Sequence, residues 1–285
     1  MIRIEAWAIM NLELKDMHIL DRTREPAPED VGYSFALDEL LGRQTGNGGP
    51  AACHLWRHPR AFVIGSKDSR LPGAADAVKW LERQGYSVLL RNSGGAAVPL
   101  DQGVVNVSLI LPIDARIPQR FHADFERMYS LIRRTLSAYG CEVTRGEVAG
   151  SYCPGDYDLR VDGLKFCGIA QRRQVRAMII QAFVIVDGSG SERAELVKAF
   201  YDRAGVGTEP DDYPFVRPEV MTSLQERGIA GVEGAEAFTE AIIRHLRERL
   251  PEYATAASFH PLRLPERATI EESCRLLRQR YPLPR

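Results

Sequence analysis

The sequence predicts a mixed α/β (α+β) fold in which helices flank a mixed, largely antiparallel sheet and a helical C-terminal part follows. Short runs rich in Val, Ile and Leu alternate with amphipathic segments over the first two thirds of the chain. An Asp162-Gly163 pair lies between two strand-like runs, which is the usual signal of a tight hairpin. After Asp187 the patterns are helical. These three observations together predict the fold class.

The helices are predicted from apolar side chains that recur at helical spacing. Val31, Phe35 and Leu41 share one face, and the glycine-rich run from Gly46 to Pro50 ends that segment. The predicted helices lie at about 31–44, 74–84, 121–139, 191–203, 218–226, 235–250 and 269–280. We expect one domain, because the sequence contains no internal repeat and no clear linker. It spans 1–285, with a core at about 30–250 and a helical C-terminal segment at about 188–285.

The strands are predicted from apolar runs that are too short for helices and are bounded by turn residues. VVNVSLIL and VRAMIIQAFVIV are the two most apolar runs, and DLRV and LKFCGIAQRR form the two arms of the predicted hairpin. The predicted strands lie at about 52–58, 61–66, 86–91, 104–111, 158–161, 164–173 and 175–186.

The composition excludes several classes of protein. The formal net charge is -1 and the basic residues are scattered, so we expect neither nucleic acid nor an anionic membrane as a partner. The sequence contains no apolar run of about 20 residues, the length that a membrane helix requires, and we expect a cytoplasmic protein. The five cysteines form no C-x-x-C pair, which argues against a disulfide framework and against a tetrahedral zinc site.

The loop Asn92-Ser93-Gly94-Gly95-Ala96-Ala97 contains no bulky side chain. Its backbone amides can therefore approach a ligand closely, and a thin aliphatic chain can lie over them. Arg91, at the start of the loop, can bind a carbonyl or a carboxylate. The loop matches neither the P-loop nor the dinucleotide-binding pattern. A plain turn between two strands is the alternative interpretation of the two glycines.

Cys153 is the candidate nucleophile because it lies in the turn Ser151-Tyr152-Cys153-Pro154-Gly155, where a thiol is at least partly accessible. Lys165 follows beyond the predicted hairpin turn, and the returning strand can bring its ammonium near the sulfur. A nearby cation raises the thiolate fraction, and the thiolate is the attacking species. The alternative is that Cys153 and Lys165 are a spectator thiol and a solvated strand lysine. Cys167 is the competing nucleophile, although its position in a strand favours packing.

Two longer stretches carry a family resemblance. RNSGGAAVPLDQGVVNVSL followed by DLRVDGLKFCGIAQRR resembles, in order and spacing, the signature stretches of the biotin/lipoate protein ligase and lipoyltransferase superfamily. The resemblance implies the catalytic fold of that superfamily, with the glycine-rich loop covering an acyl chain and Lys165 contacting the acyl carbonyl. The residues implied to form the acyl pocket are Arg91, Ser93, Gly94, Gly95, Ala97 and Asn106.

Within the superfamily, GSYCPGDYDLRVDGLKF is most similar to the octanoyl-[glycine cleavage H protein]:protein N-octanoyltransferase (LipL) branch. That branch implies an acyl-thioester on Cys153, with Lys165 lowering the thiol pKa and contacting the oxyanion. The implied reaction belongs to lipoate biosynthesis and moves an octanoyl group from a lysine of glycine cleavage H protein to a lysine on the lipoyl domains of 2-oxoacid dehydrogenases. Both ends of the reaction are lysine amides, so neither ATP nor a metal is expected.

Three alternative functions stay open at this point. The first is an octanoyltransferase that takes its acyl group from acyl carrier protein. The second is an ATP-dependent lipoate-protein ligase, which is disfavoured because Pro99-Leu100-Asp101 replaces the Phe-His-Asp that usually follows the glycines in ligases. The third is a non-enzymatic module that binds a carrier protein. The identity of the acyl chain, octanoyl or lipoyl, is not determined by these motifs.

Overall fold

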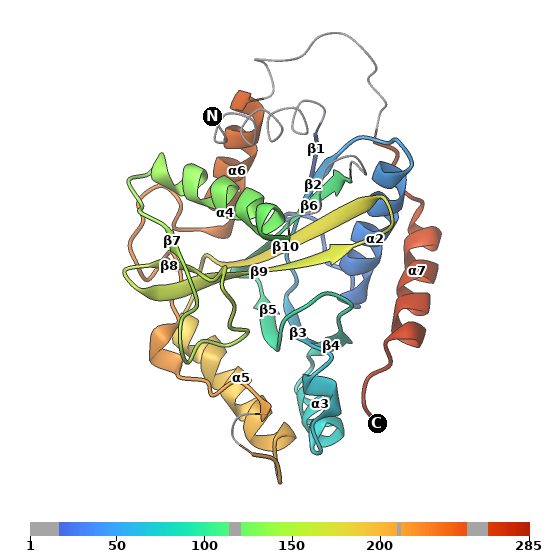
Figure 1. Ribbon diagram of the computed structural model, residues 1–285, viewed down its shortest axis with the longest axis vertical. Coiled ribbons are helices and arrows are strands. Elements are labelled where there is room, and N and C mark those ends of the chain that lie inside the picture. The colour runs from blue at the N-terminus through green and yellow to red at the C-terminus, as the bar shows by residue number, and fades with distance from the viewer. Residues whose placement is uncertain (1–16, 114–120, 210–211, 250–261) are drawn as a thin grey trace.

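A computed structural model describes residues 17–113, 121–209, 212–249 and 262–285. Its main sheet has seven strands in the order β1-β2-β6-β10-β9-β8-β7 (Figure 1). The strands are β1 (His18–Asp21), β2 (Ala52–Trp56), β6 (Val104–Pro112), β7 (Thr144–Arg145), β8 (Leu159–Val161), β9 (Leu164–Arg173) and β10 (Ala177–Ile185). β1 pairs with β2 in parallel, and every other pair in this sheet is antiparallel.

A second, three-stranded sheet has the order β4-β3-β5. It consists of β3 (Arg60–Ile64), β4 (Ser87–Leu90) and β5 (Val98–Asp101). β3 pairs in parallel with β4 and antiparallel with β5, so the glycine-rich loop connects the two edge strands of this small sheet. The loop therefore has to cross the end of β3 to reach β5.

Helices cover both faces of the main sheet, and the alternation of side chains along its strands shows how. Leu109 and Leu111 of β6 pack in a cluster with α4 (Phe121–Ser137) and α6 (Ala235–Arg249). Ile110, between them, packs in another cluster with α2 (Gly32–Gly46) and α7 (Arg267–Arg280). Successive strand residues point to opposite faces, so these helix pairs lie on opposite sides of the sheet. Figure 1 shows α7 on the outer side of α2.

A third cluster forms around the small sheet. Phe62 of β3 packs against Phe200 of α5 (Gly190–Ala204), with ring centroids 5.0 Å apart. Ala77 and Leu81 of α3 (Ala74–Arg83) belong to the same cluster, and both are fully buried. The helix α5 is capped at its start by Ser189, whose hydroxyl accepts from the Glu192 amide at 3.2 Å.

The predicted fold class is confirmed, and most predicted elements are present within two or three residues. The predicted helix 218–226 is wrong, because the structure forms a single 3₁₀ turn at Pro218–Val220. The amides of Thr222 and Leu224 donate to the carbonyls of Lys165 and Ile185, so this segment bonds to the sheet instead of to itself. The strands β1, β5 and β7 were not predicted, and the end of the predicted helix 235–250 lies outside the described residues.

In the part of the chain that the structure describes, no helix combines the length and the apolar character needed to cross a bilayer.

The packing of α4 on the main sheet gives a prediction about stability. Ile132 is fully buried against this sheet, so Ile132→Ala should lower the free energy of unfolding by about 2–5 kcal/mol through lost burial and a residual cavity. Ser137→Ala, at an exposed position of the same helix, should change it by less than about 0.5 kcal/mol. Urea denaturation followed by circular dichroism measures both. Equal effects of the two substitutions would contradict this packing.

Candidate active site

Cys153 lies in the segment between β7 and β8, with its side chain partly exposed, as predicted. Its backbone is left-handed, with a φ of 47°. Residues other than glycine rarely adopt this conformation. Where one does, contacts with the surrounding structure maintain the conformation. The thiol is thus presented by a constrained turn.

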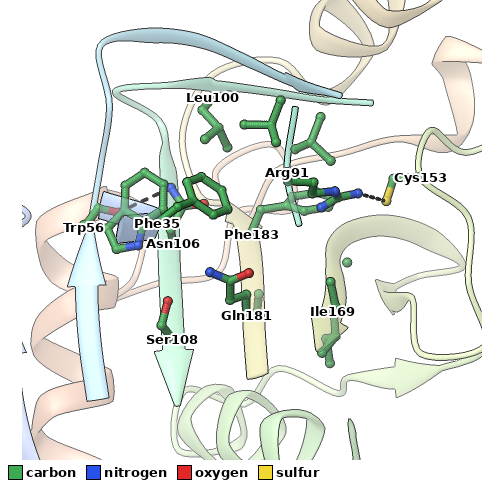
Figure 2. A pocket seen from close by; sticks show the side chains of 15 residues that line it. Phe35, Trp56, Arg91, Leu100, Asn106, Ser108, Cys153, Ile169, Gln181 and Phe183 are labelled. Carbon is green, nitrogen blue, oxygen red and sulfur yellow. Dashed lines mark hydrogen bonds between the residues drawn. The ribbon is translucent and has the colours of Figure 1, made fainter. Parts of the chain in front are cut away.

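Two hydrogen-bond donors point at the sulfur of Cys153. The guanidinium Nη2 of Arg91 lies 3.2 Å away, and the backbone nitrogen of Ala96 lies 3.3 Å away. Figure 2 shows the guanidinium of Arg91 extending toward the sulfur. One cation and one amide donor are therefore placed where negative charge lies during nucleophilic attack by this sulfur.

Arg91 reaches this position with few other partners. Its side chain is buried, its Nη2 also donates to the carbonyl of Ala96 at 2.5 Å, and its Nε has no hydrogen-bond partner. Among the described residues, no carboxylate lies within 4.0 Å of its guanidinium. Burial raises the pKa of the Asp68 carboxyl, and the charge of Arg91 offsets part of that rise from a longer distance. Burial in a low dielectric strengthens the attraction between this charge and the sulfur.

The glycine-rich loop requires glycine at Gly95, which has a φ of 102°. A Cβ atom there would lie 2.2 Å from Nη2 of Arg91 and 2.9 Å from the sulfur of Cys153. The carbonyl of Gly95 also approaches Gly65 so closely that a Cβ at Gly65 would lie 2.0 Å from it. At Gly95 the backbone of the loop therefore packs closely against Arg91 and Cys153 and leaves no room for a side chain. A side chain at Gly94 would meet no atom within 4 Å.

The end of the loop is attached to α5 by hydrogen bonds. The amide of Ala97 donates to the hydroxyl of Tyr201 at 3.2 Å, and that hydroxyl donates to Asp68 at 2.9 Å. Asp68 in turn accepts from the amide of Gly65 at 2.7 Å. Burial raises the pKa of the Tyr201 phenol well above its usual value, so this hydroxyl stays a donor to the carboxylate.

Lys165 lies on β9 directly beneath the Cys153 turn and is fully buried. Its ammonium is within 2.7 Å of the carbonyl oxygens of both Tyr152 and Cys153, and 2.8 Å from Asp158 Oδ1. Burial raises the pKa of the Asp158 carboxyl, and the ammonium of Lys165 offsets part of that rise. The lysine therefore lies close to Cys153, as expected, but it binds the backbone of the turn, while Arg91 and Ala96 contact the sulfur.

A narrow, mainly apolar pocket opens beside the thiol. Cys153 and Arg91 line it together with the predicted Asn106, and its walls come from the large sheet, the small sheet and α2 (Figure 2). Ser93, Gly94, Gly95, Ala97 and Lys165 do not line it. The further lining residues are Phe35, Trp56, Val63, Val98, Leu100, Ser108, Gly168, Ile169, Ala170, Gln181, Ala182 and Phe183. A pocket with these walls suits an aliphatic chain.

One buried carboxylate organises the polar side chains of the pocket. Asp38 of α2 accepts from the hydroxyl of Ser108 at 2.6 Å and from the amide of Gln181 at 2.8 Å, and it lies 2.8 Å from Nδ1 of His54. Asn106 donates weakly to the carbonyl of Trp56 at 3.4 Å. These bonds fix the orientation of Ser108 and Gln181, so the polar part of the wall is rigid.

Several of these residues were not predicted from the sequence. Alternation along VVNVSLIL places Ser108 on the same face as Asn106, and this pattern was available as a signal. No local pattern distinguishes Asp158 from the neighbouring Asp156, because the partnership with Lys165 is made by the pairing of β8 with β9. Phe35 and Trp56 resemble ordinary core residues until α2 and the two sheets are assembled.

The other cysteines are buried. Burial raises the pKa of Cys167 far above its usual value and that of Cys53 to about 12, so both stay protonated thiols at neutral pH. In the ranges 17–113, 121–209, 212–249 and 262–285, no three His, Cys, Asp or Glu side chains are grouped as metal ligands are.

Comparison with known proteins shows the family of the chain. Residues 30–247 match the family model of the lipoyl protein ligase A/B catalytic domain. The chain belongs to this family. It is 43% identical to the octanoyl-[GcvH]:protein N-octanoyltransferase of Bacillus velezensis over 73% of this chain and 74% of that one. It is 36% identical to the corresponding enzyme of Anoxybacillus flavithermus, over 86% of both chains.

A third relative has a different name, the lipoyl-[GcvH]:protein N-lipoyltransferase of Listeria monocytogenes, and is 37% identical over 73% of this chain and 75% of that one. Among solved structures, lipoate-protein ligase A bound with ATP has a TM-score of 0.64 and 20% identity, covering 92% of both chains. A putative lipoate protein ligase of T. acidophilum with bound lipoic acid has a TM-score of 0.61 and 19% identity, covering 93% of this chain and 94% of that one. These structures share the fold.

The contact between Arg91 and the sulfur predicts a change in thiol reactivity. Arg91→Gln should slow the alkylation of Cys153 by iodoacetamide at pH 7 about tenfold, because the thiolate loses its adjacent cation. Arg91→Lys should slow the alkylation less, because it keeps a cation at this position. Arg83→Gln, at an exposed position of α3, should leave the alkylation rate unchanged. Mass spectrometry of the Cys153 peptide measures the rate. An unchanged rate in folded Arg91→Gln would rule out this role.

The buried pair of Lys165 and Asp158 predicts a loss of stability when its acid is neutralised. Asp158→Asn should lower the free energy of unfolding by about 3–5 kcal/mol, because the ammonium of Lys165 stays buried without its counter-charge. Asp156→Asn, at an exposed position of the same segment, is the matched control and should have little effect. Chemical denaturation measures both, and similar stabilities would show that the pair does not hold the turn.

Proposed function

We propose that this protein moves an octanoyl group from a lysine of glycine cleavage H protein to a lysine on the lipoyl domains of 2-oxoacid dehydrogenases, through a thioester on Cys153. The observation that carries the proposal is the sulfur of Cys153, held by Arg91 and the Ala96 amide beside a narrow apolar pocket. The printed names of relatives that are 36–43% identical to this chain support H protein as the donor. The lipoyl-domain acceptor is an expectation from the family resemblance.

In the first step, the thiolate of Cys153 attacks the carbonyl carbon of the octanoyl-lysine amide. The bond between that carbon and the lysine nitrogen breaks, and the amine leaves with the proton that the thiol has lost. The octanoyl chain lies between the apolar walls of the pocket. Arg91 and the Ala96 amide are placed to stabilise negative charge on the sulfur before attack and on the neighbouring oxyanion during attack.

In the second step, the deprotonated amine of the acceptor lysine attacks the thioester carbonyl and the carbon–sulfur bond breaks. The sulfur leaves as a thiolate and then takes the proton that the amine loses on becoming an amide. The same two donors stabilise the departing thiolate, so one arrangement serves both steps. The reaction exchanges one lysine amide for another and is close to isoenergetic. The proposal therefore requires neither ATP nor a metal, and it makes the transfer reversible.

Lys165 is assigned an indirect role in this mechanism. Its contacts with the carbonyls of Tyr152 and Cys153 hold the left-handed turn that presents the thiol. The lysine is thus a positioning residue for the nucleophile in this proposal.

The test is transfer of octanoyl from octanoyl-H protein to an apo lipoyl domain without ATP, followed by intact-mass spectrometry. The wild type should complete the transfer and carry a hydroxylamine-sensitive octanoyl adduct on the Cys153 peptide. Cys153→Ala and Cys153→Ser should lower the rate about 1,000-fold or more, because the covalent route is lost. Cys167→Ala should retain the activity, since Cys167 is a buried, protonated thiol.

Three other results would replace the proposal. Transfer from octanoyl-acyl carrier protein but not from H protein would assign the protein to the preceding acyl transfer. Transfer that requires ATP and releases pyrophosphate would assign it as a ligase. Full activity of Cys153→Ala would remove the thioester from the mechanism. Parallel assays with lipoyl-H protein would determine which acyl chain the pocket prefers.

A further inference from the structure

A surface depression with an excess of positive charge lies between α2, the β9–β10 turn and α7. Five of its lining residues are arginines, and the only acid among the described residues that line it is Glu39. The arginines are Arg43, Arg172, Arg173, Arg176 and Arg280. We call this set the arginine patch. The formal net charge of the whole chain is -1, so the patch is a local concentration of charge and not a consequence of a basic protein.

Part of this charge faces solvent. Arg43, Arg176 and Arg280 are exposed, and Arg176 donates to the neutral amide oxygen of Asn47. Glu39 and Asp124 pair with Arg172 and Arg173, respectively, and are themselves buried. The two acids thus offset two of the five positive charges. Glu39 also lies 3.6 Å from Arg43, so among the described contacts Arg176 and Arg280 are the exposed arginines that pair with neither acid.

The β9–β10 turn adds an apolar group to the patch. Val175 is 95% exposed, and the turn that carries it is closed by the amide of Gln174, which donates to the carbonyl of Ala177 at 2.8 Å. Gln174 also donates from its side chain to the carbonyl of Glu39 at 3.1 Å, which attaches the turn to α2. Val175 is thus a single exposed apolar side chain on a fixed turn between Arg173 and Arg176, and arginine is one of the residues enriched at protein interfaces.

The arginine patch is bonded directly to the glycine-rich loop. Nη1 of Arg172 donates to the carbonyl of Asn92 at 2.9 Å, and the side-chain amide of Asn92 donates to Glu39. Asn92 is the neighbour of Arg91, which contacts the sulfur of Cys153. The patch therefore borders the same loop that covers the nucleophile.

We propose that the arginine patch is the docking surface for an acidic face of the protein that carries the acyl-lysine. This inference rests on the proposed function. The lysine that delivers the acyl group belongs to a folded protein, and that protein must lie at the mouth of the pocket when the acyl group reaches Cys153. The charge of the patch selects an acidic partner, and Arg is enriched in such interfaces. Val175 supplies the apolar contact. Because Arg172 and Glu39 bond to Asn92, a partner protein bound to the patch would lie beside the glycine-rich loop.

The experiment compares a protein donor with a small donor. The double variant Arg176→Glu/Arg280→Glu should raise KM for octanoyl-H protein about tenfold or more at low ionic strength with kcat nearly unchanged. Raising the salt concentration should raise the KM of the wild type for octanoyl-H protein, and it should change the KM of the variant much less. The small donor is a capped Nε-octanoyl-lysine amide, which is not attached to a protein. The rate of transfer from it should be the same for the wild type and the double variant. The matched control Arg70→Glu/Arg83→Glu reverses two exposed charges that do not line the arginine patch and should leave the KM for H protein unchanged.

Each contrary result has a separate meaning. An equal loss with the small donor would show that the patch acts on the active site and would overturn docking, as would an unchanged KM for H protein. Binding of inorganic pyrophosphate that the double variant abolishes, with H protein binding intact, would make the patch a small-anion site. If the wild type fails to transfer octanoyl at all, the proposed function fails. Docking is then still tested by measuring the affinity of Cys153→Ala for H protein with and without the two charge reversals.

Discussion

The ammonium of Lys165 is the contact on which the geometry of the site depends. It is fully buried, and it holds two successive carbonyls, those of Tyr152 and Cys153, against a strand of the main sheet. A buried cation is costly unless it is paired and fully hydrogen-bonded, and Asp158 supplies the pairing. The left-handed turn at Cys153 is strained for a residue with a Cβ, so it needs an anchor of this kind. The sheet thereby determines where the thiol is presented.

The charge that faces the sulfur comes from a different sheet. Arg91 follows β4 of the small sheet and reaches the sulfur across the glycine-rich loop, and the loop is closed against Tyr201 of α5. The nucleophile is attached to the large sheet and its stabilising donors to the small one, so the pocket lies at their junction. A change in the packing of the two sheets would move the donors away from the sulfur.

The fold is shared with lipoate-protein ligase A, solved with bound ATP, and with a putative lipoate protein ligase solved with bound lipoic acid. A fold does not define a reaction, and the chemistry lies in the residues placed on it. In this chain a thiol stands beside a cation and an amide donor at the acyl pocket. A ligase has no need of such a thiol, since its acyl-adenylate is already activated. This difference favours a covalent transfer between amides.

The sequence by itself determined the fold class, most helices and strands, and the proximity of Cys153, Lys165 and the glycine-rich loop. These follow from local signals, namely apolar periodicity, the Asp162-Gly163 turn and two family stretches. Only the tertiary structure showed that Arg91 contacts the sulfur, that Lys165 binds the backbone of the turn, and that residues 218–226 bond to the sheet instead of forming a helix. Such contacts join segments far apart in the chain, and they depend on strand register and packing, which no local pattern contains.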